Sequence, residues 1–76
     1  MNAGNRKKQF LKYLNSLPVV KKSETINDIF FELRRDEENK ELIIVRYEDG
    51  KYDYSMNQSD YQTQYFNDLL KSYSLV

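Results

Sequence analysis

Residues 41–57, ELIIVRYEDGKYDYSMN, contain the signal that decides the fold. Asp49-Gly50 at the centre of this stretch indicates a two-residue β-hairpin turn, because a type I′ turn requires positive φ at both central positions. With the turn there, the strands pair as follows: Glu48 with Lys51, Tyr47 with Tyr52, Arg46 with Asp53, Val45 with Tyr54, and Ile43 with Met56. Side chains alternate along a strand, so this register gathers the apolar partners on one face and the ion pairs on the other. The stretch therefore predicts a hairpin in one register.

Residues 26–35, INDIFFELRR, admit two interpretations. A helix is indicated by apolar residues at i, i+3, i+4 and i+7, which are Ile26, Ile29, Phe30 and Leu33. A strand is indicated by the alternation of Ile29, Phe31 and Leu33, followed by a three-residue hairpin loop with Asn39 left-handed. That loop pairs Leu33 with Ile43 and Phe31 with Val45, which belong to the apolar face of the first hairpin. This agreement favours the strand.

Two helices flank the strands. Residues 6–17 carry an amphipathic stripe that Pro18 ends, and residues 59–73 begin with Ser59-Asp60-Tyr61-Gln62, the form of a capping box. Residues 19–23 then form a connector. The sequence predicts a single α+β domain over residues 1–76 in the order αβββα, a three-stranded antiparallel meander with both helices packed on its Tyr-rich face. Residues 1–5 and 74–76 are expected to be frayed.

The apolar stripes of these elements also predict which residues are buried. The expected core consists of Phe10, Leu14, Leu17, Phe31, Leu33, Ile43, Val45, Tyr54, Phe66, Leu69 and Leu70.

The composition argues against an enzyme. There is no Cys and no His, so a thiol nucleophile, a neutral-pH proton shuttle and the commonest metal ligand are all missing. The chain has only two glycines, too few for a phosphate-binding loop. The consecutive acids at 36–38 fall in an expected turn, where water keeps carboxylates ionised. We expect no catalytic residue, no metal and no cofactor. No apolar run reaches the length of a membrane span, and a cytoplasmic location is expected.

Charge is divided unevenly along the chain. Six bases and no acid lie within residues 1–22, whereas the other six bases and all 12 acids lie beyond them. This split has two explanations, a basic helix docked beside an acidic sheet or contact with a polyanion. The second predicts a nucleic-acid-binding surface built from the six bases Arg6, Lys7, Lys8, Lys12, Lys21 and Lys22.

The αβββα order resembles the double-stranded-RNA-binding domain in topology. That family carries a Lys-rich motif at the start of its second helix, where this chain has Ser59-Asp60-Tyr61-Gln62 and no base. The resemblance therefore covers the order of elements alone, and nucleic-acid binding is the alternative function.

A protein-binding module is the preferred interpretation. In the predicted register, Phe30, Leu42 and Ile44 cluster on the outer face of the sheet, and an exposed apolar cluster with a charged rim is typical of an interface. The rim consists of Arg34, Arg46, Lys51 and Asp53. The partner is expected to be a protein that docks on this face or on the sheet's exposed edge, with a second copy of the chain as the simplest choice. Abundant residues with AT-rich codons suggest a phage- or plasmid-encoded inhibitor of a host macromolecule.

Overall fold

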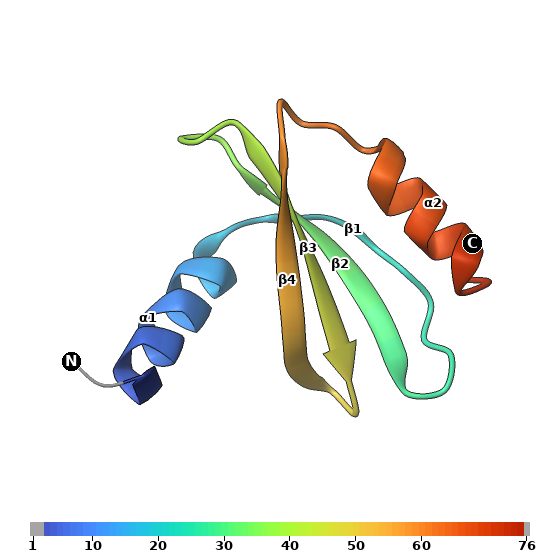
Figure 1. Cartoon of the computed structure of the whole chain (residues 1–76), viewed down its shortest axis with the longest axis horizontal. Coiled ribbons are helices and arrows are strands. Elements are labelled where there is room, and N and C mark those ends of the chain that lie inside the picture. Colours follow the sequence, from blue (N-terminus) through green and yellow to red (C-terminus); the bar gives the residue numbers. More distant parts are fainter. Residues whose placement is uncertain (1–2, 76) are drawn as a thin grey trace.

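The computed structural model describes residues 3–75, and Met1, Asn2 and Val76 lie outside them. Its elements in chain order are α1 (Ala3–Ser16), β1 (Val19–Lys22), β2 (Ile29–Asp36), β3 (Glu41–Glu48), β4 (Lys51–Ser59) and α2 (Gln64–Ser72). The strands form one antiparallel sheet in the order β1-β2-β3-β4 (Figure 1). The α+β class and the strand interpretation of β2 are confirmed, but the meander has four strands rather than three.

The added strand is β1, which lies where a connector was predicted. It continues into β2 through a tight turn in which Ile26 and Ile29 exchange both backbone hydrogen bonds at 3.0 Å. Asn27 and Asp28 between them both have positive φ, 54° and 64°. Asn and Asp tolerate this conformation better than other non-glycine residues, so this turn is a second type I′-like hairpin.

The helix boundaries differ from the prediction at both ends of the chain. α1 begins at Ala3, so residues 3–5 are helical rather than frayed. The expected capping box does not start α2, because Ser59 is the last residue of β4 and the helix begins only at Gln64. Between them, Asp60 and Tyr61 turn the chain with positive φ.

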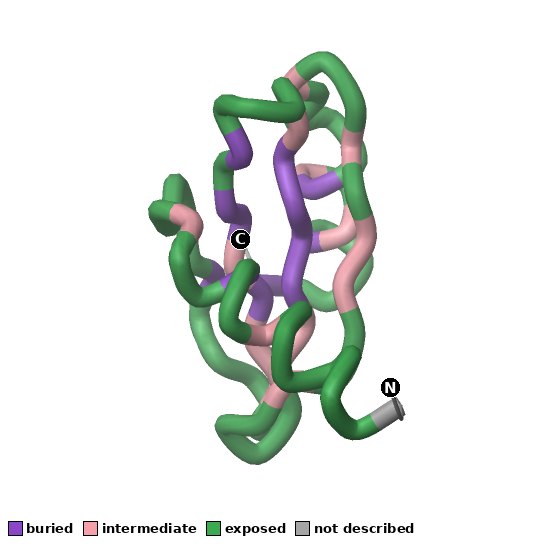
Figure 2. The backbone as a smooth tube through the Cα atoms, turned by 90° about the vertical axis from the view of Figure 1, so that its left-hand side faces the viewer, coloured by how far each residue is buried: buried purple, intermediate pink, exposed green. Residues whose placement is uncertain are grey.

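The two helices lie on opposite sides of the sheet (Figure 1). Leu14 of α1 packs with Ile43 and Val45, whereas Phe66 and Leu70 of α2 pack with a separate cluster on the other side. The prediction that both helices cover one face is wrong. Figure 2 shows the buried stretches running along the inner strands, with the connections exposed.

The β2–β3 register explains this difference. The loop spans residues 37–40, and Lys40, not Asn39, has the positive φ of 54°. This loop is one residue longer than predicted, so Leu33 pairs with Ile44 instead of Ile43. A slip of one residue turns every side chain of a strand to the other face.

The β3–β4 hairpin is confirmed at its turn and shifted further along. Asp49 and Gly50 have φ values of 54° and 74°, and the first two predicted pairs are present. A bulge then interrupts the ladder between Tyr47 and Arg46, and beyond it Met56 lies opposite Ile44. One extra residue in β4 is enough to change the face of all that follow.

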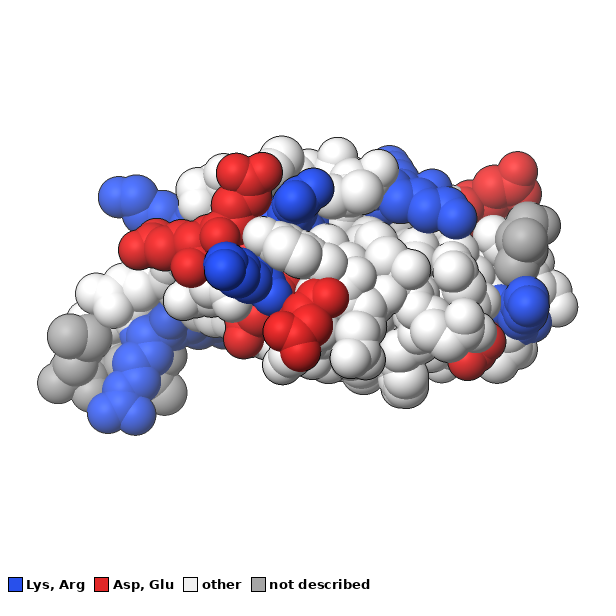
Figure 3. All heavy atoms as spheres, turned by 90° about the horizontal axis from the view of Figure 1, so that it is seen from above, with Lys and Arg blue, Asp and Glu red and all other residues white. Residues whose placement is uncertain are grey.

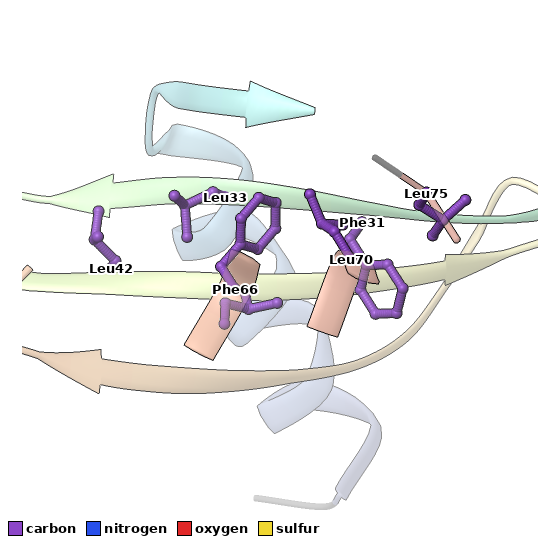
Figure 4. Packing of buried hydrophobic residues seen from close by; sticks show 7 residues of the cluster. Phe31, Leu33, Leu42, Phe66, Leu70 and Leu75 are labelled. Carbon is purple, nitrogen blue, oxygen red and sulfur yellow. The ribbon is translucent and has the colours of Figure 1, made fainter. Parts of the chain in front are cut away.

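The core is consequently larger on the α2 side than predicted. Leu42 and Ile44, expected outside, are 4% and 1% exposed, and they pack with Phe31, Leu33, Phe66, Leu70 and Leu75 (Figure 4). Burial of Leu75 shows that residues 74–75 fold under α2 rather than fraying, and Val76 lies outside the described residues. In the opposite direction, Phe10 and Tyr54 were expected in the core and are 36% and 38% exposed.

A polar contact ties α1 to the β2–β3 hairpin. The Tyr13 hydroxyl donates a hydrogen bond to the Asp36 carboxylate, which also accepts two from Asn39, at 3.1 Å from its backbone N–H and at 2.8 Å from its side chain. The hydrogen bond from Tyr13, followed by those from Asn39, lowers the pKa of Asp36. Burial, and then the neighbouring Asp36, raises the pKa of Tyr13 to about 12, so this donor keeps its proton.

We expect this contact to make stability depend on pH on the acid side. Because the pKa of Asp36 is lower in the folded chain, its contribution is present above the unfolded value of about 4 and is lost as pH falls through the folded pKa. Tyr13→Phe should therefore lower the free energy of unfolding at pH 7, and by progressively less below pH 4. Urea denaturation across this range measures it. In Tyr65→Phe, which removes an exposed hydroxyl from α2, the effect should not vary with pH.

Candidate functional site

The predicted partner-binding residues do not form one surface. Phe30 and Arg34 lie on the side of the sheet that carries α1, whereas Leu42 and Ile44 face α2. Since Leu42 and Ile44 are buried in the α2 cluster, the apolar centre of the predicted patch is part of the core. The prediction of an exposed Phe30–Leu42–Ile44 cluster is wrong because the predicted β2–β3 register was shifted by one residue, which turned these side chains to different faces.

Arg34 holds the end of α1 rather than facing solvent. Its Nη1 donates to the backbone oxygens of Leu14 at 3.2 Å and Leu17 at 2.9 Å, and its Nη2 lies 2.9 Å from Glu32 Oε1. Cations are favourable at a helix C-terminus, where the last carbonyls lack partners. Burial lowers the pKa of the Arg34 guanidinium, but the neighbouring Tyr47 and Glu32 outweigh this, and the pKa lies above its usual value.

The other predicted rim residues are partly engaged within the chain. Arg46 makes the predicted ion pair with Asp53, and a further one with Glu48 at 3.6 Å. Its guanidinium also lies 5.7 Å from the centre of the Tyr54 ring. Lys51 is exposed in the hairpin beside Glu48.

Phe30 is likewise enclosed by its neighbours. Its ring stacks on Tyr47 with 4.7 Å between centroids and 11° between planes, and the Lys22 ammonium lies 4.6 Å from its centroid. Binding of a base or another flat group to this ring would have to displace one of these contacts.

The two edges of the sheet differ in how they are protected. β1 is four residues long, contains a bulge between Val19 and Lys21, and ends in two lysines. Such features block the addition of another strand. β4 is nine residues long, and from residue 54 to 59 its sequence YSMNQS contains neither a charge nor a proline. The sequence predicted an exposed sheet edge without naming its residues. The uncharged stretch 54–59 of β4 is such an edge.

The hydrogen-bond pattern shows which groups of β4 face outward. The Arg35 N–H donates to Pro18 O, away from β3. Because alternate residues of a strand turn their backbone groups to opposite neighbours, Ile44 of β3 then faces β4 and bonds to its partner Met56. Ser55, next to Met56, turns its N–H and C=O outward, and so does Asn57. In the described part of the chain no strand pairs with this side of β4.

An apolar strip lies beside this edge on the α2 side. Met56 is half-buried against the α2 cluster, and Tyr54 next to the bulge is 38% exposed. On α2, Tyr65 is 46% exposed and lies one turn from the half-buried Leu69. The other flank of α2 faces β1 and Lys21, so the flank with Tyr65 and Leu69 faces β4.

The six predicted nucleic-acid-binding bases divide into separate groups. Arg6, Lys7, Lys8 and Lys12 are exposed along α1, and none of the ion pairs among the described residues includes them. Figure 3 shows blue side chains projecting at the end of the molecule where α1 lies. Lys21 and Lys22 belong to β1 and lie over the rings of Phe66 and Phe30, on opposite faces of the sheet.

A hollow of about 210 Å³ lies between β1 and α2, lined by Lys21, Gln64, Asn67, Leu70 and Lys71. Its lining offers amide and ammonium donors and no carboxylate. Among residues 3–75, no three side chains of the metal-binding types Asp and Glu gather into a candidate metal site.

No family model, no curated protein and no solved structure matches this chain. None of the helices in residues 3–75 is long and apolar enough to cross a membrane.

Proposed function

We propose that this chain is a protein-binding module, not an enzyme, and that it adds a strand of its partner to the open edge of β4. The observation that carries the proposal is the uncharged stretch 54–59 at a sheet edge. Natural proteins rarely leave such an edge bare, because its free N–H and C=O groups are a template for another chain. Strand addition uses those groups for affinity and the alternating side chains for specificity.

The partner contact extends beyond the backbone. A stable interface buries about 800 Å² on each partner, which a single strand edge does not supply. The strip of Tyr54, Met56, Tyr65 and Leu69 offers additional apolar area on one side of the added strand. Tyrosines are among the residues that contribute most at interfaces. In this proposal the chain blocks or recruits a host macromolecule, as a phage or plasmid product would.

Removal of one outward donor tests the proposal. Ser55→Pro removes the N–H of Ser55 and leaves the β3–β4 ladder intact, since proline is tolerated where an edge N–H faces solvent. Ser55→Ala is the matched control, because both variants lose the hydroxyl that lies 3.2 Å from Tyr52. Both should keep the circular-dichroism spectrum of the original chain. In affinity capture from cells that produce the chain, the alanine variant should retain the same partner and the proline variant should lose it.

If Ser55→Pro does not fold, the donor can be removed by another route. The chain is then made by chemical synthesis with the amide nitrogen of Ser55 methylated. Capture that survives loss of this N–H would contradict strand addition at β4.

Nucleic-acid binding through α1 is the second candidate, favoured by its four cations, which form no ion pair among the described residues. It predicts affinity for oligonucleotides that falls steeply with salt, because neutralised phosphates release their counterions. It also predicts that Ser55→Pro leaves this affinity unchanged.

A further inference from the structure

The N-terminal part of α1 extends beyond the sheet, and the role assigned to it below rests on the proposed function. Leu14 packs over β3, on Ile43 and Val45. Phe10 lies over β4, with its ring centroid 6.2 Å from that of Tyr52. Between these two positions α1 therefore crosses from one strand to the next.

The rise of a helix and the spacing between strands indicate how far α1 continues beyond Phe10. A helix rises about 1.5 Å per residue, so the four residues from Leu14 to Phe10 span about 6 Å. Neighbouring strands lie about 4.8 Å apart. Because Tyr52 pairs with Tyr47, the same path also runs along the strands toward the Asp49-Gly50 turn. One further turn of α1, at Arg6 and Lys7, thus reaches past β4 near that turn, beside the position that the end of an added strand would occupy.

Lys7 is on the side of α1 that faces the sheet. It precedes Leu14 by seven residues and Phe10 by three, and residues at these spacings share one face of a helix. Yet Lys7 is exposed, and among residues 3–75 no strand follows β4 in the sheet. Arg6, one turn before Phe10, borders the same stripe, whereas Lys12 points to the opposite side.

We infer that the strand added to β4 is an acidic, amphipathic segment of a partner protein, with carboxylates facing Arg6 and Lys7 and apolar side chains facing the α2 strip. The period of two along a strand permits this division of its side chains between the two faces. Opposite charge across the new contact stabilises it and excludes basic segments.

A second copy of the chain fits this position less well. The edge stretch 54–59 carries no acid that could meet Lys7. The charges therefore favour a different, acidic protein as the occupant.

Synthetic nine-residue peptides provide the test. The probe alternates glutamate with valine and tyrosine, and its comparison peptides replace every glutamate by glutamine or by lysine. Binding to the full chain is measured by fluorescence anisotropy at low salt.

Because a charge reversal replaces an attraction by a repulsion, Lys7→Glu should weaken binding of the glutamate peptide about ten-fold. Lys12→Glu is the matched control with the same change in net charge, and it should weaken the peptide less than about three-fold. The lysine peptide should bind Lys7→Glu better than the original chain.

The outcomes separate the two levels of the proposal. If glutamate and glutamine peptides bind equally and both are lost in Ser55→Pro, strand addition holds and acidic specificity is wrong. Equal weakening by Lys7→Glu and Lys12→Glu would also overturn the placement of Lys7 over the strand. If no peptide binds and Ser55→Pro captures its partner normally, the proposed function itself fails. A dimer in sedimentation that Ser55→Pro dissociates would assign the edge to a second copy. If an oligonucleotide displaces the glutamate peptide from the original chain but not from Lys12→Glu, α1 binds nucleic acid instead.

Discussion

Phe66→Ala should remove about half of the stability of the fold or more. The Phe66 side chain is fully buried at the centre of the α2 cluster, where it meets side chains of β2 and β3 (Figure 4). Truncating a buried Phe costs about 3–5 kcal/mol, because transfer free energy is lost and a cavity remains. A chain of 76 residues has roughly 4–11 kcal/mol in total. We expect the urea midpoint to fall to about half of its original value or lower.

Tyr65→Ala is the matched control for this prediction, because Tyr65 is the neighbouring aromatic residue on α2 and is 46% exposed. Its effect on unfolding should stay within about 1 kcal/mol, as for most surface substitutions. If the two variants lose equal stability, α2 does not pack on the sheet through Phe66.

Arg34→Met is expected to have an effect of similar size by a different route. It leaves Glu32, whose side chain is only 13% exposed, without its cation, and it removes the side-chain donor to the Leu14 and Leu17 carbonyls at the end of α1. Breaking a buried pair by removing one partner costs about 3–5 kcal/mol. The unfolding free energy from urea titration measures the loss, and amide exchange should show α1 affected more than α2.

A double variant distinguishes the two parts of this cost. Replacing Glu32 by Gln together with Arg34→Met removes the unpaired charge and leaves only the missing donor, worth about 1–3 kcal/mol. The double variant should therefore be more stable than Arg34→Met alone. A double variant that is less stable than the single one would show that Glu32 is stabilised without Arg34.

Local signals predicted the elements better than their faces. Asp49-Gly50 gave the correct turn because its conformation depends on the two residues themselves. The β2–β3 register depended on whether the loop has three residues or four, and the composition of residues 37–40 does not distinguish them. The bulge at Asp53 has no local signal either, so the face of Met56 could not be derived.

One overlooked signal concerns the position of the helices. Leu42, Ile43, Ile44 and Val45 are consecutive apolar residues, and such runs are typical of strands buried on both faces. Together with the adjacent Phe30 and Phe31, this run indicates one helix on each side of the sheet, as observed. Ile26-Asn27-Asp28-Ile29 is a second overlooked signal, since Asn and Asp adopt positive φ most readily after glycine. Recognition of that turn would have predicted β1.

The candidate site was predicted only in part. The sequence predicted an interaction surface at the basic residues of α1 and named the exposed edge without its residues, and both belong to the site proposed above. The predicted apolar centre of the partner-binding patch was wrong because it depended on the β2–β3 register, which differs by one residue from the prediction. Lys7 could not be distinguished from Lys12 as a site residue until the crossing of α1 over β4 was known.

The meander order also governs how the chain reaches this structure. Every strand pairs with its neighbour in sequence, across the short connections 23–28, 37–40 and 49–50. Short loops cost little entropy to close, and domains rich in such local contacts fold in about milliseconds or less. During synthesis each hairpin can close as soon as its second strand has emerged. β4 is the last strand to emerge, so the unprotected edge of the sheet forms only after the inner strands are available to pair.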